Sequence, residues 1–146
     1  MELLENPIQE YAWGSHTVLA ELLGRPVPAD RPQAELWIGA HPAASSLLPG
    51  GRSLAEHIAA DPGAALGPET AAAYGPRLPF LLKVLAVARP LSLQVHPDPG
   101  QARRGFAAEQ ERGVPIDAPH RNYRDGRAKP EILCAVTEFT ALCGFR

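Results

Sequence analysis

The sequence predicts a mainly β protein, a sandwich or barrel that also contains a few short helices. Sixteen prolines and thirteen glycines are spread along the 146 residues, where they separate many short segments. Several of these segments are short apolar runs, and others alternate polar and apolar residues, as strands do. Many short strands between Pro/Gly turns are typical of all-β folds.

Composition excludes several classes of protein and partner. The chain has the length of one domain, with 45% hydrophobic and 21% charged residues, as in ordinary globular proteins. A net charge of −2 gives no basic footprint for nucleic acid or an anionic membrane. Residues 1–5 lack the basic start of a signal peptide, and no apolar run reaches membrane-spanning length. We therefore expect a cytoplasmic protein with no nucleic-acid or membrane partner.

Both cysteines, Cys134 and Cys143, lie in or beside apolar, strand-like sequence. Two thiols in such surroundings indicate buried free cysteines in a reducing compartment, not a disulfide framework. This prediction supports the cytoplasm as the compartment.

Helix start and stop signals place most of the predicted helices. Residues 15–23 form a short apolar-faced helix that Ser15 caps and that ends at Gly24 and Pro26. Residues 53–60 begin with a Ser-x-x-Glu capping box, and residues 68–74 form another short helix. Between the first two helices, residues 35–39 form a strand that ends before a His-Pro pair.

One apolar run carries a single charge. Residues 80–88 are short and rich in strand formers, which predicts a strand buried on both faces, yet Lys83 interrupts them. Because burying an ammonium without a partner is costly, Lys83 either extends to the edge of the sheet or faces a polar cavity.

The polar residues that follow this run have a spacing suited to a metal. Ser92, Gln94 and His96 alternate with apolar residues, so in a strand they share one face. Lys129 and Glu131 form a second such pair. An imidazole, an amide oxygen and a carboxylate from two strands make a ligand set that zinc accepts. The alternative is two amphipathic strands with one solvated face.

The rest of the chain is a capped helix, a loop and two strands. Asp98-Pro99 predicts a helix over residues 99–112 that Gly113 ends, and residues 114–127 form an irregular loop. Residues 131–136 and 139–145 are predicted strands. An unpaired apolar strand at a terminus favours aggregation, so we expect this chain to be the front part of a longer one that continues after Arg146.

Six blocks in order resemble the amino-terminal part of type I mannose-6-phosphate isomerase. They are Tyr11–Ser15, Glu35–Pro42, Leu78–Leu85, Leu91–Asp98, Lys129–Glu131 and Ala141–Arg146. The resemblance implies a cupin-type jelly roll, with residues 1–146 as the amino-terminal portion of its zinc-binding catalytic domain. It also implies the interconversion of mannose 6-phosphate and fructose 6-phosphate, a step in carbohydrate metabolism that supplies GDP-mannose.

The resemblance also assigns a metal centre. It implies one Zn²⁺ per chain, held by Gln94, His96 and Glu131. A fourth ligand, a histidine, and a catalytic arginine would lie after Arg146. Many members have His before Lys-Pro-Glu, where this chain has Ala128; that position is not a ligand in the family. The four remaining histidines match no ligand block and are predicted to be turn, surface or packing residues: His16, His41, His57 and His120.

Substrate contacts follow by the same resemblance. Ser92 and Lys129 resemble residues that contact the sugar phosphate, and Lys83 matches the lysine of the substrate cavity. Trp13 and Glu35 match positions that line the pocket. Lys129 is the candidate catalytic residue, because a desolvated lysine beside a metal can have its pKa lowered towards neutrality.

The predicted reaction moves a proton between C1 and C2 of the sugar through an enediolate, and a zinc ion can act there as a Lewis acid. Two alternatives share parts of this pattern. One is a zinc cupin that binds a phosphorylated sugar without isomerising it, and the other is a metal-free β-sandwich interaction module. The predicted partner is a small-molecule sugar phosphate, and the sequence predicts no particular oligomeric state.

Overall fold

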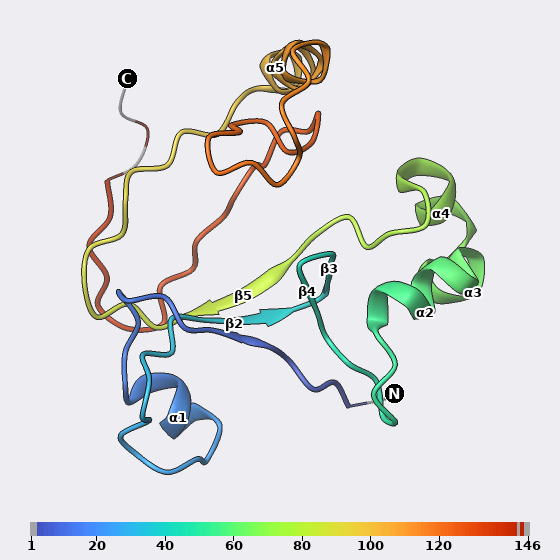
Figure 1. Ribbon diagram of the computed structural model, residues 1–146. Coiled ribbons are helices and arrows are strands. Elements are labelled where there is room, and N and C mark those ends of the chain that lie inside the picture. The colour runs from blue at the N-terminus through green and yellow to red at the C-terminus, as the bar shows by residue number, and fades with distance from the viewer. Residues whose placement is uncertain (1–2, 143, 145–146) are drawn as a thin grey trace. The chain divides into compact units, whose positions relative to one another are not determined.

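A computed structural model of the chain describes residues 3–142 and 144. The chain divides into two compact units, Met1–Ser92 and Leu93–Arg146, and each is described here by itself. Figure 1 shows the first unit with its sheet and four helices, and the second with one long helix and extended chain. More residues lie in helices than in strands, so the β content is lower than the sequence predicts.

A three-stranded antiparallel sheet organises the first unit. Its strands are β1 (Ile8–Gln9), β2 (Glu35–Ile38) and β5 (Leu82–Leu85), with β2 in the centre. The predicted strand over residues 35–39 is confirmed. The predicted strand over residues 80–88 is shorter and is not buried on both faces, since Phe80 is 64% and Leu82 55% exposed.

The apolar face of this sheet carries the core. Leu36 of β2 lies opposite Ile8 of β1 and Val84 of β5, and these cross-strand pairs share one face. Helix α1 (Val18–Leu22) adds Leu19, which is fully buried against Leu36 and Ala86. The alternation of residues 35–38 therefore sends every second side chain into this cluster and the others to the opposite face.

Helix α1 begins at Val18, three residues after Ser15, which the sequence proposes as its cap. The hydroxyl of Ser15 accepts hydrogen bonds from the backbone N–H groups of Thr17, at 3.1 Å, and Val18, at 3.2 Å. Gly24 follows the helix with a φ of 63°, which favours glycine and ends the helical path. The predicted helix is confirmed but is shorter than residues 15–23, and its N-cap position is Thr17, although the Ser15 hydroxyl accepts from the start of the helix.

A small hairpin follows β2. Its strands are β3 (Ala40–His41) and β4 (Ala44–Ser45), and the fully buried Ser46 comes next. The Ser46 hydroxyl accepts from the N–H of Gly39 and donates to Asn6 Oδ1 at 2.7 Å. The hairpin is thus fastened to the segment that leads into β1.

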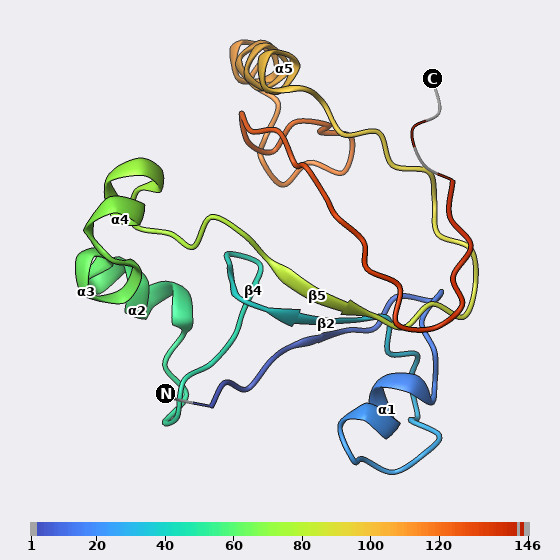
Figure 2. The same ribbon diagram turned by 180° about the vertical axis from the view of Figure 1, so that it is seen from behind.

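Three short helices follow the hairpin: α2 (Leu54–Ala60), α3 (Pro62–Leu66) and α4 (Pro68–Tyr74). In both views they form a chain of helices at the end of the sheet away from α1 (Figure 2). Ser53 caps α2, and α4 matches its predicted range. Helix α3 was not predicted, although Asp61 caps it through Ala64 N–H and Pro62 occupies its first turn, which are ordinary start signals.

Helix α5 (Pro99–Glu111) is the main element of the second unit and confirms its prediction. Asp98 and Gln101 form a reciprocal capping box, and Gly113 follows the helix with a φ of 67°. Gly105 on α5 leaves room for the ring of Tyr123, which a Cβ there would meet at 2.5 Å. The loop over residues 114–127 therefore folds back closely beside the helix (Figure 1).

A buried carboxylate holds this loop to α5. Glu109 accepts hydrogen bonds from the backbone N–H groups of Asn122, at 3.1 Å, and Tyr123, at 2.8 Å. A third partner of Glu109 is the guanidinium of Arg121, whose Nε lies 3.7 Å from a carboxylate oxygen. This guanidinium also packs on the ring of Phe106. Burial raises the pKa of Glu109, but the two N–H donors and the nearby guanidinium groups outweigh it and hold the pKa below its ordinary 4.5.

The predicted strands over residues 92–96, 131–136 and 139–142 are absent from the described structure. Within the described residues no hydrogen bond between two backbone groups joins residues 90–97 or 122–142 to another segment. Apolar side chains there are largely exposed, among them Val95 at 84% and Ile132 at 99%. A strand needs a paired neighbour, so an alternating pattern alone does not make one. Residues 143 and 145 of the predicted strand over 139–145 lie outside the described residues.

The prediction of two buried thiols is wrong for Cys134, which is a free and exposed cysteine in this unpaired segment. Cys143 lies outside the described residues. Across the part of the chain that is described, no helix combines the length and apolar character that a membrane crossing requires.

The anchoring role of Glu109 gives a test by pH. A lowered pKa means that the carboxylate stabilises the folded unit above pH 4.5 and that this stabilisation is lost as the pH falls through the folded-state pKa. We expect Glu109→Gln to lower the unfolding temperature at neutral pH and to flatten the loss of stability in acid. The helical circular dichroism signal of the chain, followed during heating at several pH values, measures both effects. The exposed neighbour Glu111 is the control, and an equal effect of Glu111→Gln would contradict the assignment.

Candidate functional site

The side chains of Glu35, Trp37 and Lys83 meet on the face of the first unit's sheet that is opposite to the apolar core. The register of β2 and β5 sets Trp37 directly opposite Lys83, and Glu35 lies two residues before Trp37 on the same face. Lys83 Nζ lies 3.2 Å from Glu35 Oε2 and 4.9 Å from the centre of the Trp37 ring. Trp37 Nε1–H donates to the same carboxylate oxygen. The sequence singled out Lys83 and Glu35, and the structure brings them together.

Burial makes this ion pair more than a surface contact. The side chain of Glu35 is 9% exposed and that of Lys83 is 33% exposed. A buried carboxylate is costly unless it is paired and hydrogen-bonded, and here one oxygen receives both an ammonium and an indole N–H. The sequence predicts that Lys83 either extends to the edge of the sheet or faces a polar cavity. In the structure its charge is paired with Glu35, and its side chain remains partly exposed to solvent.

In the second unit, His96 and Glu131 meet across 35 residues of sequence. His96 Nε2 lies 3.3 Å from Glu131 Oε2, with the two side chains 32% and 62% exposed. Two donors that bind one tetrahedral zinc at about 2.0–2.1 Å lie roughly 3.3 Å from each other, so the pair fits two corners of such a site. The described residues bring no third His, Cys, Asp or Glu to this pair.

The other residues of the second unit that the sequence predicts for the site are Gln94 and Lys129. Gln94 is exposed and takes part in no hydrogen bond within the described residues. Lys129 Nζ lies 3.6 Å from Asp125 Oδ2, and its side chain is 56% exposed. The described residues therefore supply little of the desolvation expected around Lys129. Sequence reasoning found no signal for Asp125, which lies in the irregular loop.

Two predicted substrate contacts of the first unit lie outside its polar cluster. The ring of Trp13 packs on that of Tyr11 at 5.8 Å between centres, and its carbonyl accepts hydrogen bonds from Ala88 and Arg89. Ser92 is exposed and has no hydrogen-bond partner in the described chain. Trp37 was missed by the sequence reasoning, although its spacing from Glu35 in an alternating strand could have placed it beside Lys83.

The remaining histidines follow their predictions as turn or surface residues. A ring nitrogen of His16 bonds to the carbonyl of Ala29, and that of His41 accepts from Ala43 N–H in the hairpin turn. His57 lies on α2 beside Arg52, and His120 is exposed in the loop of the second unit.

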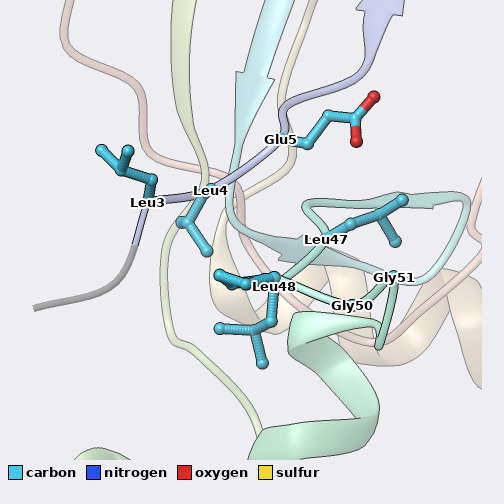
Figure 3. A pocket seen from close by; sticks show the side chains of 8 residues that line it. Leu3, Leu4, Glu5, Leu47, Leu48, Gly50 and Gly51 are labelled. Carbon is cyan, nitrogen blue, oxygen red and sulfur yellow. The ribbon is translucent and has the colours of Figure 1, made fainter.

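A hollow near the start of the chain offers no comparable chemistry. It is lined mainly by leucines and by the backbone of a glycine turn, and Figure 3 shows the carboxylate of Glu5 directed away from those leucines. Its lining residues are Leu3, Leu4, Glu5, Leu47, Leu48, Pro49, Gly50 and Gly51. Glu5 carries the single ionisable side chain in this lining, so the candidate site rests on the two polar clusters.

Comparison with known proteins assigns the family. The model of the phosphomannose isomerase type I catalytic domain matches residues 1–146, the whole chain. The chain belongs to the type I phosphomannose isomerase family. The resemblance on six sequence blocks is thereby confirmed, and His96, Glu131, Lys83 and Glu35 all lie within those blocks.

Individual relatives agree with this assignment. The chain is 47% identical to mannose-6-phosphate isomerase of Escherichia coli K12 and 36% identical to that of Homo sapiens, and the matches cover 100% and 95% of it. A crystal structure of the Salmonella typhimurium enzyme, bound to fructose 6-phosphate and zinc, matches 88% of the chain with 48% identity and a TM-score of 0.81. The chain spans 38% of the E. coli relative and 33% of that structure.

The ion pair between Lys83 and Glu35 can be tested by removing each partner. Lys83→Met leaves the buried carboxylate of Glu35 with only the indole donor, so we expect a loss of roughly 1–3 kcal/mol of unfolding free energy. Adding Glu35→Gln should restore part of that loss, because the unpaired charge is then gone. Denaturant unfolding of both single variants and the double variant measures this coupling. Additive losses would show that the pair contributes nothing in solution.

Proposed function

We propose that this chain belongs to a zinc-dependent aldose–ketose isomerase that interconverts mannose 6-phosphate and fructose 6-phosphate. The observation that carries the proposal is the His96–Glu131 pair, which has the spacing of two zinc ligands and lies in a chain of this family. The relatives named above are mannose-6-phosphate isomerases, and one of them binds zinc and fructose 6-phosphate in its crystal structure. Family membership favours this function over the binding-only cupin and the metal-free module.

The metal we propose is one Zn²⁺ per chain, held by His96, Glu131 and Gln94. One carboxylate with two neutral ligands leaves the ion with a net positive charge. When bound, such an ion supplies Lewis-acid stabilisation of the oxygen charge that develops in the transition state. The role of Glu131 and His96 is to present oxygen and nitrogen donors at the observed separation.

The chain's own residues divide the remaining tasks. We propose that Lys83 and Ser92 bind the sugar phosphate, with a point charge and a hydroxyl donor, and that Glu35 and Trp13 line the pocket. Lys129 is proposed to move the proton between C1 and C2 of the sugar as a general acid–base group. Lys129 lies two residues before the proposed ligand Glu131 in the sequence.

The fold and compartment complete the proposal. We infer that residues 1–146 form the amino-terminal portion of a cupin-type jelly roll, the zinc-binding catalytic domain of the family, and that a later histidine and arginine complete the site. The antiparallel sheet of the first unit supports this fold. The exposed free thiol of Cys134 is compatible with the reducing cytoplasm, which stays the proposed compartment.

Zinc binding is the first test. We expect the purified chain to bind one zinc ion, and His96→Ala to weaken binding by roughly tenfold or more, since even changes around metal ligands cost on this order. Competition with a chromophoric chelator measures both affinities. His120→Ala is the matched control, because His120 is an exposed histidine of the same unit. Equal affinities of the His96→Ala variant and the unmodified chain would remove His96 from the metal site.

Turnover is the second test. A chimera in which this chain replaces the matching segment of the E. coli relative should convert mannose 6-phosphate to fructose 6-phosphate in a coupled assay. We expect His96→Ala or Lys129→Met in this chimera to lower kcat by on the order of a hundredfold, and the 146-residue chain alone to be at least as impaired.

The outcome also separates the alternatives. A folded chimera that binds zinc and sugar phosphate without turnover would support the binding-only cupin. Turnover of the isolated chain close to that of the chimera would show that the proposed later ligand and arginine are dispensable.

A further inference from the structure

Trp37 is the aromatic residue of the polar sheet face, and neither the sequence pattern nor the proposed reaction gives it a task. Its position opposite Lys83 is fixed by the register of β2 and β5. The ammonium lies 4.9 Å from the ring centre, within the distance at which a cation is attracted to the face of an indole. The ring therefore acts directly on the charged group of Lys83.

Trp37 also acts on Lys83 through Glu35. The indole N–H donates to Glu35 Oε2, and the same oxygen lies 3.2 Å from Lys83 Nζ. The indole thus sets the orientation of the carboxylate that pairs with the ammonium. One side chain provides both the surface beneath the ammonium and the anchor of its counter-ion.

The ring itself is held from a further direction. Its edge packs against the imidazole of His41 with 4.8 Å between ring centres and 71° between planes. His41 belongs to the β3–β4 hairpin, which Ser46 fastens to the segment before β1. The indole plane is therefore set by the fold and does not depend on a bound ligand.

We propose that Trp37 is the positioning residue of Lys83, which it holds so that the ammonium presents its remaining donors to the phosphate of the sugar substrate. An ammonium has three N–H donors, and it pairs with a single oxygen of Glu35, so at least two donors remain for an anion. Lys83 keeps a third of its side chain exposed, which leaves those donors accessible. The inference rests on the proposed function for the identity of the anion, but not for the geometry of the cluster.

Lysine is rare in this chain, and this makes the contact directly observable. Of the 14 Lys and Arg residues in the sequence, two are lysines, Lys83 and Lys129, and the others are arginines. Selective ¹³C labelling of lysine gives two Cε–Hε signals in the whole chain, and Lys129→Arg assigns them. We expect the Hε protons of Lys83 to be shifted upfield by the ring current of Trp37. Trp37→Leu should abolish that shift and leave the Lys129 signal unchanged.

Kinetics of the chimera described above tests the positioning role. We expect Trp37→Leu to raise KM for mannose 6-phosphate by about fivefold or more, with little change in kcat, since a cation–π contact and one hydrogen bond are lost. Trp37→Phe keeps a ring face and should recover part of the effect. In a Lys83→Met background, Trp37→Leu should raise KM no further, because Trp37 acts through Lys83.

Each outcome distinguishes this inference from the proposed function. An unshifted Lys83 signal, or a KM effect that persists without Lys83, would overturn the positioning role and leave the isomerase proposal intact. A lowered unfolding temperature with unchanged KM would show that Trp37 is only structural. A chimera without any isomerase activity would overturn the proposed function, while the lysine spectrum would still test the contact between Trp37 and Lys83.

Discussion

The antiparallel register between β2 and β5 is the constraint on which the rest of the first unit depends. It places Leu36 against Val84 on one face and Trp37 against Lys83 on the other. A slip of one residue would turn every side chain of β5 to the opposite face, so Lys83 would enter the cluster around Leu19 without a partner. The core and the polar cluster are therefore two consequences of one pairing, and selection for either maintains the other.

Local signals explain which elements could be predicted. Helix ends are set by nearby side chains, such as Ser15 and the capping box at Asp98, and both predicted helices formed there. Strands depend on neighbours that are distant in sequence. Residues 35–38 find β1 and β5, whereas residues 92–96 have the same alternation and no backbone partner among the described residues. The exposure of Val95 and Cys134, which the sequence did not predict, follows from that missing partner.

The same difference between local and distant information applies to the candidate site. The sequence blocks singled out His96, Glu131, Lys83 and Glu35, and the two contacts among them join residues that are 35 and 48 positions apart. Spacing within one segment suggested Gln94 as a companion of His96, but a shared face requires a regular strand, which the described structure lacks there. Trp37 was missed for the opposite reason, since an aromatic residue in a strand is ordinarily assigned to a core.

Three carboxylates show how their surroundings decide which one can bind a metal. Glu109 is buried and accepts two backbone N–H groups beside a guanidinium, so exchanging these donors for an ion would detach a loop from α5. Glu35 is buried between an ammonium and an indole N–H, and a metal there would displace the ammonium that we assign to the substrate. Glu131 is 62% exposed and its partner among the described residues is the imidazole of His96, itself a group that binds zinc in its neutral form. Replacing that contact with two bonds to one ion breaks nothing else in the described fold, so Glu131 is the carboxylate of the three that is suited to the metal.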